Sequence, residues 1–382
     1  MIIRNALVYG EDKTFSRLDI RIEEDVFTEI CPSLAPSENE SVLDADGLYA
    51  IPGLIDIHFH GCMGHDFCDG TVEAIDAITR YEASCGVTSV CPATMTVSPE
   101  SLVQVMDAAR TYNESPARPG QASLVGINME GPFISEAKKG AQAAEHIRLC
   151  DEALFCSLQE RSGGLIKLVD IAPENEGAME FIDALHDKVT ISLAHTTADY
   201  QTAKEAYDRG ARHATHLYNA MPPFTHRAPG VVGAAFDSPH CRAELICDGV
   251  HIHPSVIRAT FAMFGAERMI LISDSMRATG LEDGEYTLGG QPVTVKGNLA
   301  TLHDGTIAGS ATNLMDCVRF VVREAGISLE DAVMCAAENP AKEIGIFEEA
   351  GSITVGKRAD FVLLDKDLNI VSVYIDGREI AC

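Results

Sequence analysis

The feature that most constrains the fold is a repeated alternation of short apolar segments with amphipathic segments, which begins at residue 52. Eight of the apolar segments have the composition of buried strands, and helical patterns lie between several of them. Strands that alternate with helices are typical of a parallel sheet, because each parallel connection needs a crossover. The predicted strands are LIDIHFHG (54–61), VTSVCPAT (87–94), SLVGINMEG (123–131), IKLVDIAPE (166–174), VTISLAHTT (189–197), HATHLYNA (213–220), AELICDGVHI (243–252) and MILISDSM (269–276).

This alternation predicts an α/β fold, a closed (β/α)8 barrel of the TIM type over residues 52–349. The chain has 382 residues, which leaves room for a second unit beside a barrel of about 250 residues. Strand-like segments lie in residues 1–51 and 350–382, and we expect both chain ends to pair into one small β-sandwich domain. An open doubly wound sheet is the alternative. It is less favoured because polar residues follow too many separate strands.

Composition narrows the classes of function. The chain has 57 acidic and 29 basic residues and a net charge of −28, which argues against nucleic acid or an anionic membrane surface as a partner. It contains no run of 18 apolar residues, and its first residues do not resemble a signal peptide, so we predict a cytoplasmic protein. The twelve Cys are scattered without a C-x-x-C pair, as is typical of reduced thiols.

Side chains that commonly bind metals stand at the C-terminal ends of the predicted strands. His58 and His60 end the first strand, and their i, i+2 spacing projects both imidazoles from the same face. Glu130, His195, His216 and Asp274 end the third, fifth, sixth and eighth strands. Any one of them alone is more simply explained as a helix cap or a hydrogen-bonded core residue. Together at one barrel mouth they would be buried without partners, at about 1–3 kcal/mol each, unless a cation satisfied them.

The set therefore predicts a divalent metal site with one or two ions per chain. Histidine with carboxylate suits zinc, the expected ion, while iron, manganese and cobalt are alternatives. Asp274 is the candidate catalytic residue. A carboxylate beside an activated water can take its proton and later return that proton to a departing amine.

Longer motifs carry a resemblance to a known family. They are PGLIDIHFHG (52–61), GINMEGPF (126–133), KKGAQ (138–142), LAHTTA (193–198), ATHLYNAM (214–221), DGVHIHP (248–254), LISDSM (271–276) and GTIAGS (305–310). With these motifs the chain resembles the amidohydrolase superfamily nearly from end to end. Within it, the chain is similar to the N-acetylglucosamine-6-phosphate deacetylase family, and MEGPF and HLYNAM are the most specific stretches.

The resemblance implies deacetylation of N-acetyl-D-glucosamine 6-phosphate to D-glucosamine 6-phosphate and acetate. It implies that Glu130, His195 and His216 hold the main metal, that His58 and His60 can hold a second ion, and that Asp274 is the general acid/base. The implied substrate-binding residues are Ala141, Gln142, Asn219, Ala220, Arg227, His251, Ile307, Ala308 and Gly309.

The phosphate binding implied by the resemblance also concerns the oligomeric state. In this family the matches of Arg227 and His251 hold the phosphate, and the arginine arrives from the neighbouring subunit, so a homodimer is expected. Local cations would then bind an anionic substrate despite the acidic surface. At the position of Gln142 some relatives have a histidine; an amide can hydrogen-bond the substrate but cannot act as a protonated electrophile.

Three alternatives stay open at this point. An N-acetylgalactosamine-6-phosphate deacetylase would differ only in the sugar epimer. A cyclic-amide hydrolase or a deaminase would leave the MEGPF and HLYNAM motifs unexplained. Many of these enzymes also bridge two metals with a Lys on the fourth strand, and the fourth strand here has no Lys at its end. A non-enzymatic barrel used as a binding scaffold would be expected to have lost metal ligands or the acid/base, whereas here all six positions are filled.

Overall fold

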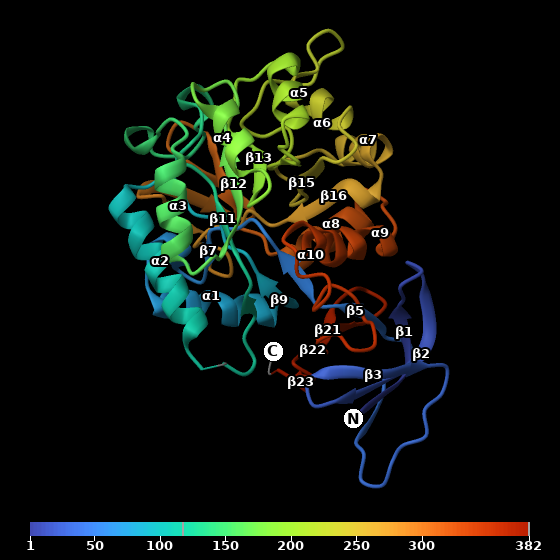
Figure 1. The fold of residues 1–382 in the computed structure, drawn as a ribbon. Coiled ribbons are helices and arrows are strands. Elements are labelled where there is room, and N and C mark those ends of the chain that lie inside the picture. The colour runs from blue at the N-terminus through green and yellow to red at the C-terminus, as the bar shows by residue number, and fades with distance from the viewer. Residues whose placement is uncertain (117, 381–382) are drawn as a thin grey trace.

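The computed structural model describes residues 1–116 and 118–380. Short parallel strands lie at its centre, as the apolar segments predict (Figure 1). These strands are β6 (Leu54–Asp56), β9 (Val87–Val90), β10 (Ser123–Leu124), β11 (Ile127–Met129), β12 (Ile166–Ile171), β13 (Thr190–Leu193), β14 (His213–Ala214), β15 (Arg242–Ile246) and β16 (Met269–Ile272). From β11 to β16 each strand pairs with the next one in the sequence. A doubly wound sheet would reverse its order at a switch point, so this order contradicts that alternative.

Hydrogen bonds beyond the strand ends curl the parallel sheet. After β9, Ala93 forms a parallel bridge with Asn128 of β11. On the opposite side, the Asp274 N–H after β16 donates to the His58 carbonyl at 2.9 Å. The His60 N–H in turn donates to the Ser275 carbonyl at 2.7 Å. The segments that follow the first and last parallel strands are therefore neighbours in space.

Helices follow the strands and cover the outside of the curled sheet (Figure 1). One helix follows β6, one follows β9, and one follows each strand from β11 to β16. This is the α/β alternation predicted from the sequence. The helices are α1 (Val72–Ser84), α2 (Pro99–Glu114), α3 (Glu152–Arg161), α4 (Ala178–Leu185), α5 (Tyr200–Asp208), α6 (Gly230–Phe236), α7 (Pro254–Phe264), α8 (Leu314–Arg323), α9 (Leu329–Val333) and α10 (Asn339–Glu343). A π-helical turn, Met334–Glu338, joins α9 to α10.

A small antiparallel sheet is inserted between β16 and α8, as its Gly-rich turns indicate. It consists of β17 (Gly284–Leu288), β18 (Gln291–Lys296), β19 (Leu299–Thr301) and β20 (Ile307–Ser310). The Gln291 side-chain amide donates to the Ala141 carbonyl, which ties this insertion to the loop that follows β11.

Segments near both ends of the chain contribute to one further sheet (Figure 1). Its strands are β1 (Ile2–Tyr9), β2 (Phe15–Glu23), β3 (Val26–Cys31), β4 (Val42–Asp44), β5 (Tyr49–Pro52), β21 (Phe361–Leu364), β22 (Ile370–Ile375) and β23 (Arg378–Glu379). The ends join where β21 pairs antiparallel with β5. Phe27, Phe361 and Tyr374 are buried in the core of this sheet, and the Phe361 and Tyr374 rings stack at 4.3 Å.

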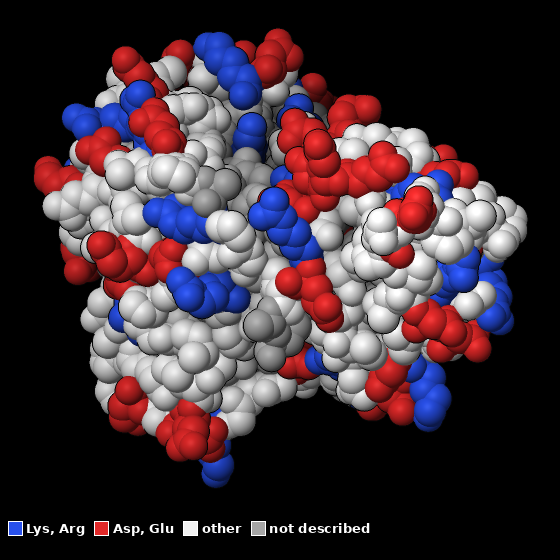
Figure 2. Space-filling model, turned by 90° about the horizontal axis from the view of Figure 1, so that it is seen from below, with Lys and Arg blue, Asp and Glu red and all other residues white. Residues whose placement is uncertain are grey.

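The surface agrees with the acidic composition. On the face drawn in Figure 2, Lys and Arg side chains lie among Asp and Glu side chains and do not form one continuous patch.

Within the described residues, no helix is both long and apolar enough to cross a membrane. The described cysteines are free thiols, and Cys156 is exposed while Cys62, Cys91 and Cys247 are among the buried ones.

Candidate metal centre and active site

All of the polar residues predicted at strand ends lie just after the C-terminal ends of the observed strands. β6 ends at Asp56, before His58 and His60, and β11 ends immediately before Glu130. The chain then leaves the regular strand geometry at three of the sites, because His195, His216 and Asp274 have positive φ angles of 42°, 28° and 50°. Left-handed backbone at a non-glycine residue costs about 1–3 kcal/mol and is concentrated at functional sites.

The carboxylate of Glu130 lies at the centre of the cluster. Its Oε1 is 3.0 Å from His195 Nε2, 3.2 Å from His216 Nε2 and 3.5 Å from His58 Nε2. Its Oε2 is 3.4 Å from His60 Nε2. Burial raises the pKa of Glu130, but hydrogen bonds from the surrounding imidazoles outweigh it and hold the pKa well below its ordinary value. Glu130 is therefore a carboxylate shared by four histidines that come from three parts of the chain.

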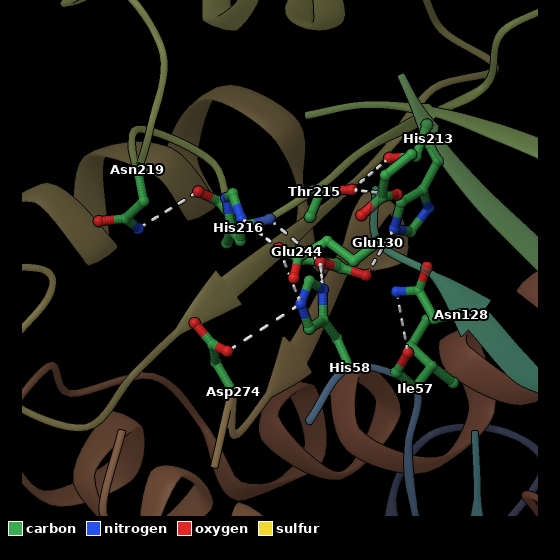
Figure 3. Close-up of polar contacts among 12 residues, drawn as sticks. Ile57, His58, Asn128, Glu130, His213, Thr215, His216, Asn219, Glu244 and Asp274 are labelled. Carbon is green, nitrogen blue, oxygen red and sulfur yellow. Dashed lines mark hydrogen bonds and ion pairs between the residues drawn. The ribbon is translucent and has the colours of Figure 1, made fainter. Parts of the chain in front are cut away.

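Asp274 faces the same cluster from β16. Its Oδ1 is 3.3 Å from His60 Nε2 and 4.0 Å from His58 Nε2. In Figure 3, the Asp274 carboxylate points toward the His58 ring from the side opposite Glu244. Burial raises the pKa of Asp274, but the hydrogen bond from His60 and the charge of His58 outweigh it, so the pKa lies below its ordinary value. Asp274 is thus ionised at neutral pH and can accept a proton.

The donor atoms fit the requirements of a divalent cation. Two groups of three potential ligands have donor atoms within 4.8 Å of one another: His58 with Glu130 and His216, and His58 with His60 and Asp274. His58 Nε2 is buried and has no hydrogen-bond partner, although it points at two carboxylates. A buried acceptor without a partner is costly, and a cation would satisfy it. Nitrogen and oxygen donors of this kind suit zinc and related ions.

A cavity of about 550 Å³ opens directly above this cluster. It exposes Glu130, His195, His216 and Asp274 to one common space, together with His60. Of the predicted substrate-binding residues, those that line it are Ala141, Gln142, Asn219, Ala220, His251, Ile307 and Gly309. Ala308 is buried between two lining residues. Arg227 lies elsewhere, exposed in the loop that precedes α6, and does not line the cavity of its own chain.

His251 lines the cavity and is hydrogen-bonded to a carboxylate. Its Nδ1 lies 2.8 Å from Asp248 Oδ2. Burial lowers the pKa of His251, but the hydrogen bond and charge of Asp248 outweigh it and raise the pKa above its ordinary value. With Nδ1 engaged by Asp248, the remaining ring nitrogen can donate to an anionic group in the cavity.

Gln142 contacts Glu130 as well as lining the cavity. Its Nε2 donates to Glu130 Oε2 at 2.6 Å, while its Oε1 accepts from the Thr96 N–H at 2.6 Å. The side chain is 2% exposed. Both ends of the amide are occupied within the protein, so Gln142 fixes the orientation of the Glu130 carboxylate.

Some residues of the site were not predicted from the sequence. Lys138 contributes its carbonyl, which lies 2.8 Å from His195 Nδ1. Lys139, Asp304 and Thr306 line the cavity, the last two from the inserted sheet. Glu244 contacts His58 and the His216 backbone from beneath. Among these residues, only Glu244 could have been noticed in the sequence, because it is an acidic residue inside the apolar segment AELICDG.

The sequence pattern of the family described as "Amidohydrolase family" matches residues 49–380. This chain belongs to the amidohydrolase family. The match includes every strand of the curled parallel sheet and every residue of the cluster around Glu130. It also includes β5, β21, β22 and β23 of the sheet formed by the chain ends.

Relatives of this amidohydrolase have narrower names, as deacetylases of two N-acetyl amino sugar 6-phosphates. An N-acetylglucosamine-6-phosphate deacetylase of Bacillus subtilis (strain 168) is 42% identical over 90% of this chain and 87% of its own length. An N-acetylgalactosamine-6-phosphate deacetylase of Escherichia coli O157:H7 is 34% identical over 88% of this chain and 89% of its own length. The crystal structure of N-acetylglucosamine-6-phosphate deacetylase from Pasteurella multocida superposes with a TM-score of 0.93 at 29% identity, over 100% of this chain and 99% of that one.

Replacement of Gly131 in this amidohydrolase tests how Glu130 is positioned. Gly131 has φ +77°, and a Cβ at this position would overlap Thr96 Oγ1. Because Thr96 also holds Gln142, Gly131→Ala should displace Glu130 and reduce the metal bound per folded chain, as measured by elemental analysis after dialysis. Gly164→Ala is the matched control, since Gly164 has φ +86° with open space around it. Both variants should lose about 1–3 kcal/mol of stability; equal metal content in the two would contradict this role of Gly131.

Proposed function

We propose that this amidohydrolase removes the acetyl group from N-acetyl-D-glucosamine 6-phosphate, which yields D-glucosamine 6-phosphate and acetate. The observation that carries the proposal is the convergence of four histidines on Glu130, with Asp274 beside two of them, at the floor of one cavity. The relatives that bear this activity in their names match the chain over nearly its full length, which supports the choice of substrate.

We assign the ligand roles as follows. Glu130, His195 and His216 would hold the main divalent cation, and His58 and His60 would hold a second one beside it. Zinc is the proposed ion, with iron, manganese or cobalt as alternatives. When bound, such a cation polarises the amide carbonyl and lowers the pKa of the attacking water.

Asp274 is the proposed general acid/base. It is ionised, 7% exposed and open to the cavity, so it can accept a proton from the attacking water through a carboxylate oxygen. The protonated carboxyl can then donate to the amide nitrogen as the carbon–nitrogen bond breaks, which releases the amine. Its contact with His60 keeps the carboxylate turned toward the reacting groups.

The phosphate would lie near His251 and would be reached by Arg227 from a second copy of the chain. Arg227 is exposed on a loop that also exposes Phe224, whose side chain is 45% accessible. An exposed aromatic ring beside an arginine is typical of residues that become buried in a protein interface. A homodimer would therefore complete the phosphate site, while Ala141, Gln142, Asn219, Ala220, Ile307, Ala308 and Gly309 would surround the sugar and the acetamide.

For the fold, we propose that the curled parallel sheet closes into a (β/α)8 barrel of the TIM type over residues 52–349. The backbone bonds between His58, His60 and the segment after β16 support this closure. Residues 1–51 and 350–382 would form the small β domain, a sandwich if their single sheet folds over the core of Phe27 and Phe361. A cytoplasmic location remains a prediction from the sequence.

The decisive experiment compares the two epimeric substrates and measures metal content in the same preparation. Acetate release should be faster, by kcat/KM, with N-acetylglucosamine 6-phosphate than with N-acetylgalactosamine 6-phosphate. The relative from Escherichia coli O157:H7 makes the galactosamine epimer the second candidate, and a preference for that epimer would favour it. Hydrolysis of neither epimer by metal-loaded protein would exclude both.

Asp274→Asn tests the proton transfer. The amide keeps the shape of the side chain but cannot accept a proton, so kcat should fall by about 10²–10⁴-fold while metal content and substrate binding persist. Steady-state kinetics with a parallel metal analysis measures this. Unchanged turnover in the metal-loaded variant would remove Asp274 from the mechanism.

Arg227→Ala tests the shared phosphate site. Loss of a charge-assisted contact should raise KM for the phosphorylated sugar by about 10- to 100-fold. Activity on N-acetylglucosamine without the phosphate should barely change, and this substrate is the internal control. An equal loss on both substrates would mean that Arg227 does not contact the phosphate.

A further inference from the structure

Glu244 is a buried carboxylate directly beneath the candidate metal centre. It lies in β15, where its neighbours Ala243, Leu245 and Ile246 are apolar and buried, and its own exposure is 0%. A charge in such a place is costly unless hydrogen bonds satisfy it. The position therefore has a specific reason to carry a glutamate.

Both oxygens of Glu244 are engaged by residues of the site (Figure 3). Oε2 lies 2.9 Å from His58 Nδ1 and accepts from the His216 N–H at 3.0 Å. Oε1 lies 3.0 Å from His213 Nε2. One side chain thus contacts a ring from the first strand segment and a backbone amide from the sixth.

These contacts fix the state of His58. Because an ionised carboxylate only accepts hydrogen bonds, His58 Nδ1 must carry the hydrogen. Its Nε2 then faces Glu130 Oε1 at 3.5 Å and Asp274 Oδ1 at 4.0 Å. A carboxylate behind a ligating imidazole sets its tautomer, fixes the ring orientation and raises its basicity.

The hydrogen bond from the His216 N–H to Glu244 positions a second candidate metal ligand, His216. His216 has φ 28°, in the left-handed region that non-glycine residues rarely adopt. A buried hydrogen bond to its N–H stabilises this conformation, which directs the imidazole toward Glu130.

Glu244 is itself held from below by a chain of alternating charges. His213 Nδ1 lies 3.4 Å from Glu343 Oε1, and Arg242 Nη1 donates to Glu343 Oε2 at 2.8 Å. Burial lowers the pKa of His213, but Glu244 and Glu343 outweigh it and raise that pKa to about 9. Glu244 therefore has a fixed cationic neighbour on the side away from the cavity.

The geometry points to Glu244 as a positioning residue that prepares His58 to hold a cation of its own beside the one held by Glu130, His195 and His216. This inference rests on the metal centre of the proposed function. The two halves of the centre should then be separable with glutamine at this position, because its amide oxygen can still accept from the His216 N–H. Loss of the charge behind His58 should weaken the half that contains His58 and leave the other half able to bind.

The test is a Zn²⁺ titration of folded, metal-free protein. The wild type should bind in two steps. Glu244→Gln, which keeps the shape but removes the charge, should weaken one step by about 10- to 100-fold. Glu343→Gln is the matched control, since Glu343 is buried and shares His213 with Glu244 but contacts none of the candidate ligands. It should keep both steps even if it lowers the melting temperature.

Equal binding by wild type and Glu244→Gln would overturn the inference, as would equal losses in Glu244→Gln and Glu343→Gln or a single step in the wild type. No binding by the wild type would overturn the metal centre itself, so the two failures differ. If Glu244→Gln does not fold, ¹⁵N NMR of the metal-free wild type still decides. His58 should carry a hydrogen on Nδ1, and a ring with its hydrogen on Nε2 alone would overturn the inference.

Discussion

The site depends on one buried negative charge, the carboxylate of Glu130, because four imidazoles are arranged around it. Desolvation opposes this charge, and hydrogen bonds from the histidines outweigh it only while their rings are held in place around the carboxylate. The surrounding structure compensates locally. Gln142 holds one oxygen, Gly131 allows the close approach of Thr96, and left-handed backbone at His195 and His216 directs their rings inward. Strain and buried charge are thus concentrated where a cation would offset them.

The net charge of the whole chain affects how an anion approaches from a distance, whereas the charges that line the cavity affect how the anion binds. A net charge of −28 opposes the approach of any anion from a distance, but salt screens such fields beyond about 8 Å. Within the cavity the balance is set by a few groups. Asp248 raises the pKa of His251 and so favours its positive charge, and Lys138 and Lys139 line the same space. An acidic protein can therefore bind a phosphorylated sugar, with affinity that depends on these near contacts.

The sequence was most informative where a residue's role follows from its place along a strand. Apolar segments predicted the parallel strands and their order, and polar residues at their ends identified every member of the Glu130 cluster. What the sequence could not supply was the partner of each side chain. Glu244 is only an acidic residue in an apolar strand until the fold brings His58 to 2.9 Å from it. Nothing in the sequence links Gln142 to Glu130, although its amide donates to that carboxylate. Such contacts depend on how the sheet curls, which strand patterns alone do not determine.

The groups that hydrogen-bond the Nδ1 atoms of His195 and His58 would also make the two halves of the metal centre chemically different. His195 Nδ1 is held by the Lys138 carbonyl, a neutral acceptor, whereas His58 Nδ1 is held by the charged carboxylate of Glu244. A charged acceptor makes the opposite ring nitrogen a stronger electron donor than a carbonyl does. An ion on the His58 side would therefore be the poorer Lewis acid and one near His195 the better. With such ions bound, a substrate carbonyl would be polarised more strongly beside His195, and Asp274, next to His60, would be left to carry the proton.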